Sequence, residues 1–460
     1  MKPSRSEDAG GVDQRSSVSR RRVFRQGAAI AGSVVASQLA VAQTPPVPAT
    51  GSGPTGKSLA GTKFRAYVRN GATSSIEELT LRPIQPQQVV IRTQAAQACY
   101  TIVNALGPPP ARPAGAPAPA AAIIGHGGVG IVEEVGSEVK RVQVGDLVVV
   151  PVTPQCGQCW MCLHGRADAC RSALGRPAVP VADMRDGTPV NGRLGGFAEL
   201  MVEWEEQTVP IFTKVPAVEL SLLSCVMTCG LGMALRRIPV EPGEEVAVFG
   251  AGPVGLSAIQ GARIAGAGQI VAVEPIRVRR ELALKLGATV ALDPNQYKGN
   301  DLVTKIKDIC KGPTDRVFSG GRGTNPVNLG PMFVLEAVGG NRFPPKVETG
   351  PDPTGVEVLQ QVWALCPPGG IIRTCGVGQP PGSTVTFPAG QWSNATKTHI
   401  PGNFAGVNTM RDLPLFVRLI ENRDFDAKSI ATSTFPLEKA REAMQEAADR
   451  TTIASVVTFG

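Results

Sequence analysis

Four of the ten cysteines in this chain lie close together in the sequence. Cys156, Cys159, Cys162 and Cys170 form the pattern C-x2-C-x2-C-x7-C. Four thiolates in one short loop match the closed tetrahedral shell of a structural zinc ion, which leaves no position for a substrate. In an oxidising compartment the same residues could instead form two local disulfides. The close spacing favours zinc.

A glycine-rich segment at residues 250–255, GAGPVG, has the pattern of a phosphate-binding turn. Gly250 permits a tight turn, Gly252 lets a pyrophosphate approach the backbone, and Gly255 allows close packing of helix on strand. The segment follows an apolar run and opens a predicted helix, Val254–Ile264, whose N-terminus attracts phosphate. The sequence therefore predicts a dinucleotide site.

An acidic residue, Glu274, ends the next predicted strand, Gln269–Val273. It follows the glycine-rich segment at the offset that the dinucleotide motif requires of its acidic residue. A carboxylate there can accept hydrogen bonds from the adenosine ribose hydroxyls and would repel a 2′-phosphate. We therefore predict NAD rather than NADP, with Arg279 as a further cofactor contact from the following helix.

Two regions with different sequence patterns must position the cysteines and the glycine-rich segment. Residues 63–226 contain short β-rich runs broken by Gly and Pro, which indicates a small barrel-like β domain. Residues 227–404 alternate strands and helices, which predicts a parallel sheet built from βαβ units. Residues 405–460 add two helices and a final strand. Residues 108–122 are almost wholly Pro, Ala, Gly and Arg, which predicts a surface loop.

Individual elements follow from the same patterns. The predicted strands are Gln88–Arg92, Val129–Val132, Asp146–Val150, Glu245–Phe249, Gln269–Val273 and Ser455–Phe459. The predicted helices are Val254–Ile264, Arg277–Leu286, Leu413–Glu421 and Leu437–Ala448.

Residues 1–62 have the features of a targeting signal followed by a linker. Residues 1–42 contain RRRVF at 20–24, a mildly apolar stretch, and the small-residue pattern AVA at 40–42. The RRVF core is similar to the twin-arginine export motif, and A-x-A is typical of signal cleavage. Residues 43–62 predict a flexible linker. We expect a periplasmic or secreted protein; the alternative is a disordered basic tail.

Charge and hydropathy exclude two classes of partner. The net charge of the chain is +8. Residues 1–42 contain seven Lys/Arg and three acidic residues, a surplus of +4, so the remainder of the chain also carries +4. The sequence has no basic stripe with interleaved aromatics, so nucleic-acid binding is not expected. No apolar run reaches the roughly 20 residues of a bilayer span, so we expect none in the mature chain.

The cysteine spacing at 156–170, followed by the glycine motif at 250–255, resembles the zinc-dependent medium-chain alcohol dehydrogenase/reductase family over nearly all of residues 63–460. The resemblance implies an α/β fold: a Rossmann doubly wound parallel sheet at 227–404, inserted in a GroES-like β-rich catalytic domain made of 63–226 and 405–460.

The same resemblance implies a catalytic zinc site. Its protein ligands would be Cys99 in a C-x-T motif, His126 after Gly125, and Cys225, which precedes the dinucleotide loop at the family's spacing. Thr101 would bind the substrate oxygen and relay its proton. The implied substrate is an alcohol or aldehyde that exchanges a hydride with the nicotinamide.

Five positions depart from the family pattern. They are Gly127 in place of Glu, Ile102 in place of Asp, Asn104 in place of His, Cys229 in place of Thr, and Ala454 in place of a pyrophosphate-binding Arg. Losses around a metal site commonly cost about 10–100-fold in metal affinity or activity. A scaffold that binds zinc and dinucleotide without catalysis is therefore an alternative.

A long Pro-rich segment, Asn341–Gly355, is loosely similar to an insertion in the formaldehyde dehydrogenase and dismutase subgroup, whose members can retain their cofactor tightly. The leading hypothesis is an exported oxidoreductase whose NAD stays bound and is recycled by an electron acceptor that the sequence does not identify. An aldehyde dismutase, which needs no acceptor, is a second alternative. Family members are commonly dimers or tetramers, which implies a homo-oligomer.

Overall fold

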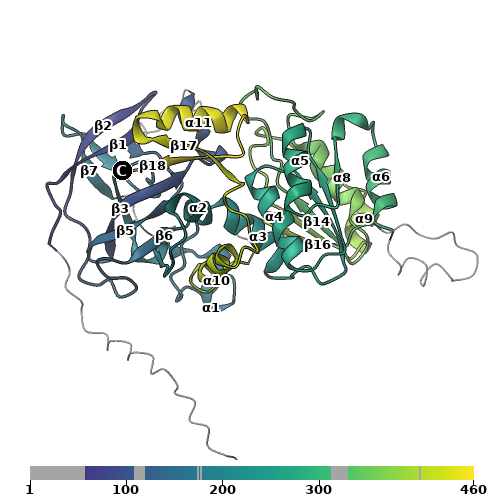
Figure 1. Ribbon diagram of the computed structural model, residues 1–460, viewed down its shortest axis with the longest axis horizontal. Coiled ribbons are helices and arrows are strands. Elements are labelled where there is room, and N and C mark those ends of the chain that lie inside the picture. Colours follow the sequence, from purple (N-terminus) through teal and green to yellow (C-terminus); the bar gives the residue numbers. More distant parts are fainter. Residues whose placement is uncertain (1–56, 108–119, 173–175, 177–178, 312–329, 403–405) are drawn as a thin grey trace, which may run out of the picture. The chain divides into compact units, whose positions relative to one another are not determined.

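The structure is a computed structural model, and it describes residues 57–107, 120–172, 176, 179–311, 330–402 and 406–460. The predicted export signal lies outside these residues. So do most of the predicted linker and most of the predicted loop at 108–122. The described residues form three sheets and the helices that cover them (Figure 1).

One sheet consists of six parallel strands, and it is the predicted dinucleotide-binding sheet. In spatial order they are β13 (Val290–Leu292), β12 (Gln269–Val273), β11 (Glu245–Phe249), β14 (Phe333–Glu336), β15 (Ile371–Thr374) and β16 (Thr398–Pro401). Numbered along the chain from β11, this is the order 3-2-1-4-5-6 of a doubly wound Rossmann sheet. The fold prediction is confirmed.

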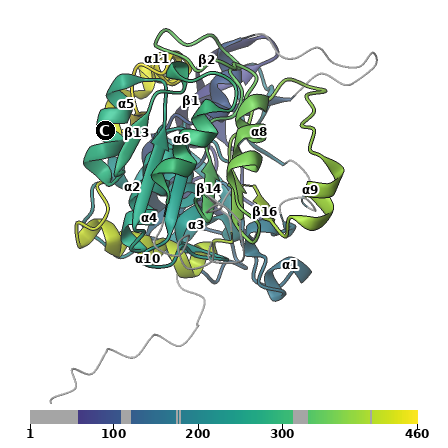
Figure 2. The same cartoon turned by 90° about the vertical axis from the view of Figure 1, so that its right-hand side faces the viewer.

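Alternate residues of the central strand β11 enter two separate cores. Val246 and Val248 pack in one core with helices α3 (Val226–Leu235), α4 (Pro253–Ile264) and α5 (Arg277–Leu286). Ala247 and Phe249 pack in a second core with α6 (Asp301–Ile309) and α8 (Val356–Leu365). A strand that is buried on both faces reads as a continuous apolar run, as VAVF does here. Figure 2 shows these helices around the strands.

The β-rich part contains the other two sheets. A closed barrel has the order β1 (Lys63–Asn70), β2 (Thr73–Leu81), β7 (Pro180–Asp183), β8 (Pro189–Asn191) and β4 (Ala121–Ile123). A seven-stranded sheet has the order β10 (Val209–Pro210), β6 (Leu147–Val150), β5 (Gly128–Val135), β3 (Gln88–Gln97), β18 (Ala454–Thr458) and β17 (Ala431–Pro436), with β9 (Leu200–Trp204) also paired to β3.

The C-terminal segment completes the second of these sheets. Strand β18 pairs antiparallel with β3 and parallel with β17. Helix α11 (Ala440–Asp449) connects β17 to β18 and runs alongside both strands (Figure 1). The remaining described helices are α1 (Trp160–Leu163), α2 (Ala217–Ser221), α9 (Ala389–Asn394) and α10 (Thr409–Glu421).

All the predicted strands and helices are present, most of them with shifted ends. Helix α10 begins at Thr409 rather than Leu413, because the side chain of Asn408 accepts the Arg411 N–H and caps the helix. The helix predicted from Leu437 starts as a 3-10 turn, Leu437–Lys439, before α11. Within the described ranges no single helix is long and apolar enough to cross a bilayer; segments 217–224 and 226–235 meet that test only jointly and are bent by 62°.

Candidate active site

One cavity brings together residues from both halves of the fold. It is lined by the predicted metal ligands Cys99, His126 and Cys225, and by Thr101. The predicted cofactor residues Gly250, Gly252, Val254, Glu274 and Arg279 line the same cavity. The two groups of predicted residues therefore face one space, although they belong to different domains and are far apart in the sequence.

The three predicted ligands of the catalytic metal converge. One ligand atom from each of Cys99, His126 and Cys225 lies within 4.8 Å of the others, and the two sulfurs are 3.9 Å apart. Two thiolates on a tetrahedral zinc with bonds of about 2.3 Å would be about 3.8 Å apart. The donor set and the spacing therefore fit zinc.

The electrostatics of this cluster select Cys99 as the thiol that ionises first. Hydrogen bonding with Cys225, and the nearby His126 ring, lower the pKa of Cys99 well below its ordinary value although burial opposes this. Hydrogen bonds with Cys229 and Cys99, together with burial, raise the pKa of Cys225 well above its ordinary value. Burial is the largest influence on His126 and lowers its pKa, but the charge and hydrogen bond of Cys99 together with the charge of Cys229 outweigh burial, and the net shift is upward.

Thr101 sits in the middle of this cluster. Its Oγ1 donates to Cys99 Sγ at 3.2 Å and lies 2.6 Å from His126 Nδ1. It belongs to the 3-10 segment Tyr100–Leu106, which begins directly after Cys99. Asn104, the substitute for the family's relay histidine, is exposed on the same segment and does not line the cavity.

The glycine that replaces the family's glutamate has a steric cause. Gly127 has a φ of +76°, and a Cβ there would lie 2.0 Å from the Val150 carbonyl oxygen. L residues rarely adopt such a backbone conformation, and the contact itself is impossible. In this packing the residue after His126 has to be glycine.

The dinucleotide loop has the close approaches that its glycines predict. Gly250 has a φ of +88°, and a Cβ on Gly255 would lie 1.7 Å from the Gly250 carbonyl oxygen. Gly252 is the N-cap of α4, and Pro253 occupies the first helical position. The helix therefore starts at the loop with its N–H groups free to meet a phosphate.

Glu274 is fixed to this loop by its own carboxylate. It is buried, Oε2 accepts the Ala251 N–H at 2.7 Å, and Oε1 accepts the Ile276 N–H at 3.0 Å. Arg279 is also buried beside it, donates to the Thr452 carbonyl oxygen at 2.9 Å, and has a pKa lowered by burial. Both side chains are thus held rigidly at the cavity wall.

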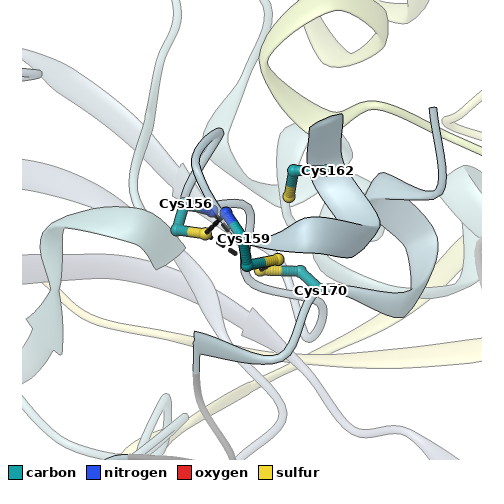
Figure 3. A group of neighbouring side chains, drawn as sticks. All are labelled: Cys156, Cys159, Cys162 and Cys170. Atoms are coloured by element: carbon teal, nitrogen blue, oxygen red, sulfur yellow. Dashed lines mark hydrogen bonds between the residues drawn. The ribbon is translucent and has the colours of Figure 1, made fainter. Parts of the chain in front are cut away.

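The four-cysteine lobe forms a second cluster (Figure 3). Single sulfurs of Cys156, Cys159, Cys162 and Cys170 lie within 4.8 Å of one another. Cys170 Sγ lies 3.6 Å from Cys156 Sγ and 3.9 Å from Cys159 Sγ. The Cys159 N–H also donates to Cys156 Sγ at 3.3 Å. The cluster fits a tetrahedral zinc, and its four cysteines form no disulfide.

Among the cavity-lining residues that sequence reasoning missed are Cys229, Cys375, Tyr100 and Arg450. Of these, only Cys229 stands out in the sequence, as a departure from the family pattern. Cys229 lies one helical turn after Cys225, so its place on the same face of α3 could have been inferred. Hydrogen bonding with Cys229 raises the pKa of Cys375 well above its ordinary value. Arg450 follows α11 and has no motif that points to the cavity.

Comparison with known proteins agrees with this geometry. Residues 85–213 match the alcohol dehydrogenase GroES-like domain, and residues 253–422 match the zinc-binding dehydrogenase domain. The chain is 32% identical to an S-(hydroxymethyl)glutathione dehydrogenase of Escherichia coli over 54% of this chain and 68% of that one. It is 34% identical to a geraniol dehydrogenase of Castellaniella defragrans over 53% of this chain and 65% of the relative.

Solved structures show the same fold. Benzyl alcohol dehydrogenase from Acinetobacter calcoaceticus has a TM-score of 0.70 and 26% identity, over 87% of this chain and all of that chain. An alcohol dehydrogenase zinc-binding domain protein from Burkholderia ambifaria has the same score and identity, over 86% and 99%.

The fold and its two cysteine-containing clusters define an oxidoreductase of the zinc-binding, dinucleotide-binding class. The chain belongs to the zinc-dependent alcohol dehydrogenase family, for which zinc and NAD are the expected cofactors. It matches 65% of the length of the S-(hydroxymethyl)glutathione dehydrogenase of Saccharomyces cerevisiae, at 32% identity over 53% of this chain.

Proposed function

We propose that this protein is an exported zinc-dependent oxidoreductase that transfers a hydride between an alcohol or aldehyde and a tightly bound NAD. One observation carries the proposal. The cluster of Cys99, His126 and Cys225 opens into the cavity that the dinucleotide loop also lines. A substrate held at the cluster would therefore lie beside the cofactor. The relatives named for geraniol and benzyl alcohol support an alcohol as the substrate class.

The roles of the chain's own residues follow from their positions. Cys99, His126 and Cys225 would hold the metal and, as three ligands, leave one position for the substrate oxygen. Bound zinc would lower the pKa of an alcohol or polarise a carbonyl. Thr101 Oγ1, beside Cys99 and His126, would hold the substrate hydroxyl and take up its proton. Thr101 would release its own hydroxyl proton as it takes up that of the substrate, and because the exposed Asn104 cannot titrate, water would be the next acceptor.

The residues of the dinucleotide loop bind and orient the cofactor. Gly250, Gly252 and Gly255 admit the pyrophosphate to the N-terminus of α4. Glu274 lines the same cavity, where its carboxylate would accept hydrogen bonds from the ribose hydroxyls and repel a 2′-phosphate, which supports NAD. Bound NAD would accept or return the hydride.

The loop at 341–355 supports slow release of the cofactor. It lines the cavity through residues including Asn341, Thr349 and Asp352. Contacts with the β-rich part hold it there: the Tyr100 hydroxyl accepts the Arg342 N–H at 2.9 Å, and Lys346 pairs with Asp449 at 2.8 Å. Arg450 adds a hydrogen bond to Asn341 and stacks 5.4 Å above the Tyr100 ring.

The localisation, the domain limits and the assembly belong to the same proposal. The RRVF and AVA patterns support export after folding, with zinc and NAD acquired in the cytoplasm. We assign 63–226 and 405–460 to the catalytic domain and 227–404 to the dinucleotide domain, in a homo-oligomer. A cofactor that remains bound needs either an outside electron acceptor or a second aldehyde molecule, as in a dismutase.

The test combines metal analysis with the cofactor content of extensively dialysed protein. We expect two zincs per chain, near-stoichiometric NAD(H), and alcohol oxidation with an artificial acceptor and no added NAD. Cys99→Ser should remove one zinc and the turnover, whereas Cys366→Ala, in the second core, should change neither.

Tyr100→Phe should speed the loss of NAD during dialysis. One zinc with full turnover would contradict the catalytic metal, released NADP(H) would overturn the role of Glu274, and aldehyde turnover without any acceptor would identify a dismutase.

A further inference from the structure

The loop that carries His126 packs closely against the turn at residues 192–196. At the closest contacts both segments have glycine, because a Cβ would not fit there. A Cβ on Gly125 would lie 2.1 Å from the Gly196 nitrogen, and one on Gly196 would lie 2.2 Å from the Gly127 carbonyl oxygen. The Gly127 N–H donates to the Leu194 carbonyl oxygen at 3.1 Å, and just after the turn the Phe197 N–H donates to the Ile124 carbonyl oxygen at 3.0 Å. The position of His126 therefore depends on where the turn holds Leu194.

Leu194 is held in an unfavourable conformation. Its φ is +56°, in the left-handed region, which is unfavourable for a residue with a Cβ. Such a conformation persists only where the surroundings impose it. The Leu194 carbonyl oxygen accepts the Gly196 N–H at 2.8 Å, and the Leu194 N–H donates to Glu203 Oε1 at 2.6 Å. The second of these bonds is made by a side chain.

Glu203 is an unusual residue for its position on β9. It is fully buried, and within the described part of the chain its Oε2 has no hydrogen-bond partner. Burial raises its pKa to about 8, although the Leu194 N–H opposes the shift. A buried polar atom without a partner is costly, and an aliphatic side chain would avoid that cost. What glutamate contributes here is the acceptor for Leu194.

We infer that Glu203 is a positioning residue for the metal ligand His126, acting through Leu194 and Gly127. This inference rests on the proposed function, because it assumes that His126 binds zinc. The chain of contacts is direct: Glu203 Oε1 fixes the Leu194 amide, and the Leu194 carbonyl fixes the amide that follows His126. Partners that orient a metal-binding histidine typically change metal affinity by about 10–100-fold when removed.

The experiment measures the release of zinc to a chelator from the full-length protein. Glu203→Leu should release one of two zincs at least about tenfold faster than wild type and keep the other. Glu203→Gln retains an acceptor for Leu194 and should release zinc at the wild-type rate. The matched control is Glu134→Leu, because Glu134 is also buried and also accepts one backbone N–H, from Leu59 at 2.7 Å; its release should equal that of wild type.

Several outcomes would overturn the inference. They are wild-type release from Glu203→Leu, release from Glu203→Gln as fast as from Glu203→Leu, or equally fast release from Glu134→Leu. If Glu203→Leu does not fold, Glu203→Val, which suits a strand, takes its place.

A second measurement separates this inference from the proposed function. If the wild-type protein binds only one zinc, the proposed catalytic metal is wrong, and amide hydrogen exchange then decides whether Glu203 positions the loop. Faster exchange at Gly127 and Leu194 in Glu203→Leu, but not in Glu203→Gln, would support it. Unchanged exchange would overturn it.

Discussion

Cys159 contributes both its backbone and its thiol to the four-cysteine lobe. Burial opposes ionisation, but the N–H donors of Arg171 and Cys162 outweigh it and lower the pKa of Cys159 to about 6. A thiol that ionises near neutral pH is ready to bind a metal. The lobe lies in a loop with only short helices of its own, so a bound ion would supply much of its order.

We predict that Cys159→Ser removes about one zinc per chain and lowers the melting temperature, because three thiolates cannot close the shell. Metal analysis and thermal unfolding check this. Cys366→Ser is the control, since it removes a cysteine from a core without a metal cluster among the described residues. Full zinc content with unchanged melting in Cys159→Ser would reject the structural role.

The carboxyl of Glu203 predicts a pH dependence of stability. Its pKa is raised by burial from 4.5 to about 8, so between these values the folded chain keeps a proton that the unfolded chain releases. The free energy of unfolding should therefore fall as the pH rises through this window, by at most about 1.4 kcal/mol per pH unit.

Glu203→Gln cannot titrate, so its stability relative to wild type should increase from pH 5 to pH 8. Denaturant unfolding at both pH values measures the difference. Parallel profiles for the two proteins would contradict the prediction.

The sequence predicted the residues of the site that stand in motifs. Both cysteine sets and the glycine loop have fixed spacings, because metal and phosphate geometry dictate them. Glu203, Cys375 and Arg450 were missed for the opposite reason. Each reaches the site only through tertiary packing, and no local pattern separates Glu203 from the acids around it in EWEE.

Helix α3 connects the metal cluster to the Rossmann core, and a buried arginine holds its end. Arg373 on β15 is fully buried and donates to the Gly232 carbonyl oxygen at 2.7 Å and to the carbonyl oxygens of Arg236 and Ile238. The Gly232 carbonyl oxygen already accepts the Arg236 N–H, so Arg373 adds a second donor there and satisfies two carbonyls just beyond the helix. Burial lowers the pKa of Arg373 to about 10.

We predict that Arg373→Leu lowers the free energy of unfolding by about 3 kcal/mol, because it removes three charge-assisted hydrogen bonds at the end of α3. Arg277→Leu is the control, since Arg277 is exposed and its ion pair with Glu281 lies on the surface. Denaturant unfolding checks both. A loss below about 0.5 kcal/mol in Arg373→Leu would show that water replaces the guanidinium.

At the scale of elements, the predicted bounds match the structure where one hydrophobic pattern runs without interruption. Strands β11 and β12 and helix α5 have the predicted bounds, because each is a run of one pattern between clear breaks. Strands β3 and β5 of the β-rich part are longer than predicted; β3 runs to Gln97 rather than Arg92. Polar residues such as Gln94 and Gln97 interrupt its apolar pattern, while pairing with three neighbouring strands continues the ladder.

At the scale of the whole molecule, the proposed function combines an export signal with cofactors that the cytoplasm would supply. We predict that the mature protein begins near Gln43 and is found in the periplasm already containing nicotinamide. Replacing Arg21 and Arg22 together by Lys should leave the unprocessed chain in the cytoplasm. Mass measurement of the N-terminus in each cell fraction checks this; an intact N-terminus in the periplasm or unaffected export of the double variant would contradict it.

The placement of β18 between β3 and β17 affects the order in which the two domains can fold during synthesis. The described strands of the parallel sheet all lie between β10 and β17 in the chain, so that sheet can assemble while synthesis continues. Strand β3 ends at Gln97, whereas its partner Ala454–Thr458 follows the whole parallel sheet in the chain. Until then its edge stays open to any other strand. A chain that stalls just before Ala454 would therefore contain a folded dinucleotide domain and a catalytic domain with an unpaired strand edge. Because that edge can pair with other chains, we expect late truncation to cause more aggregation than early truncation.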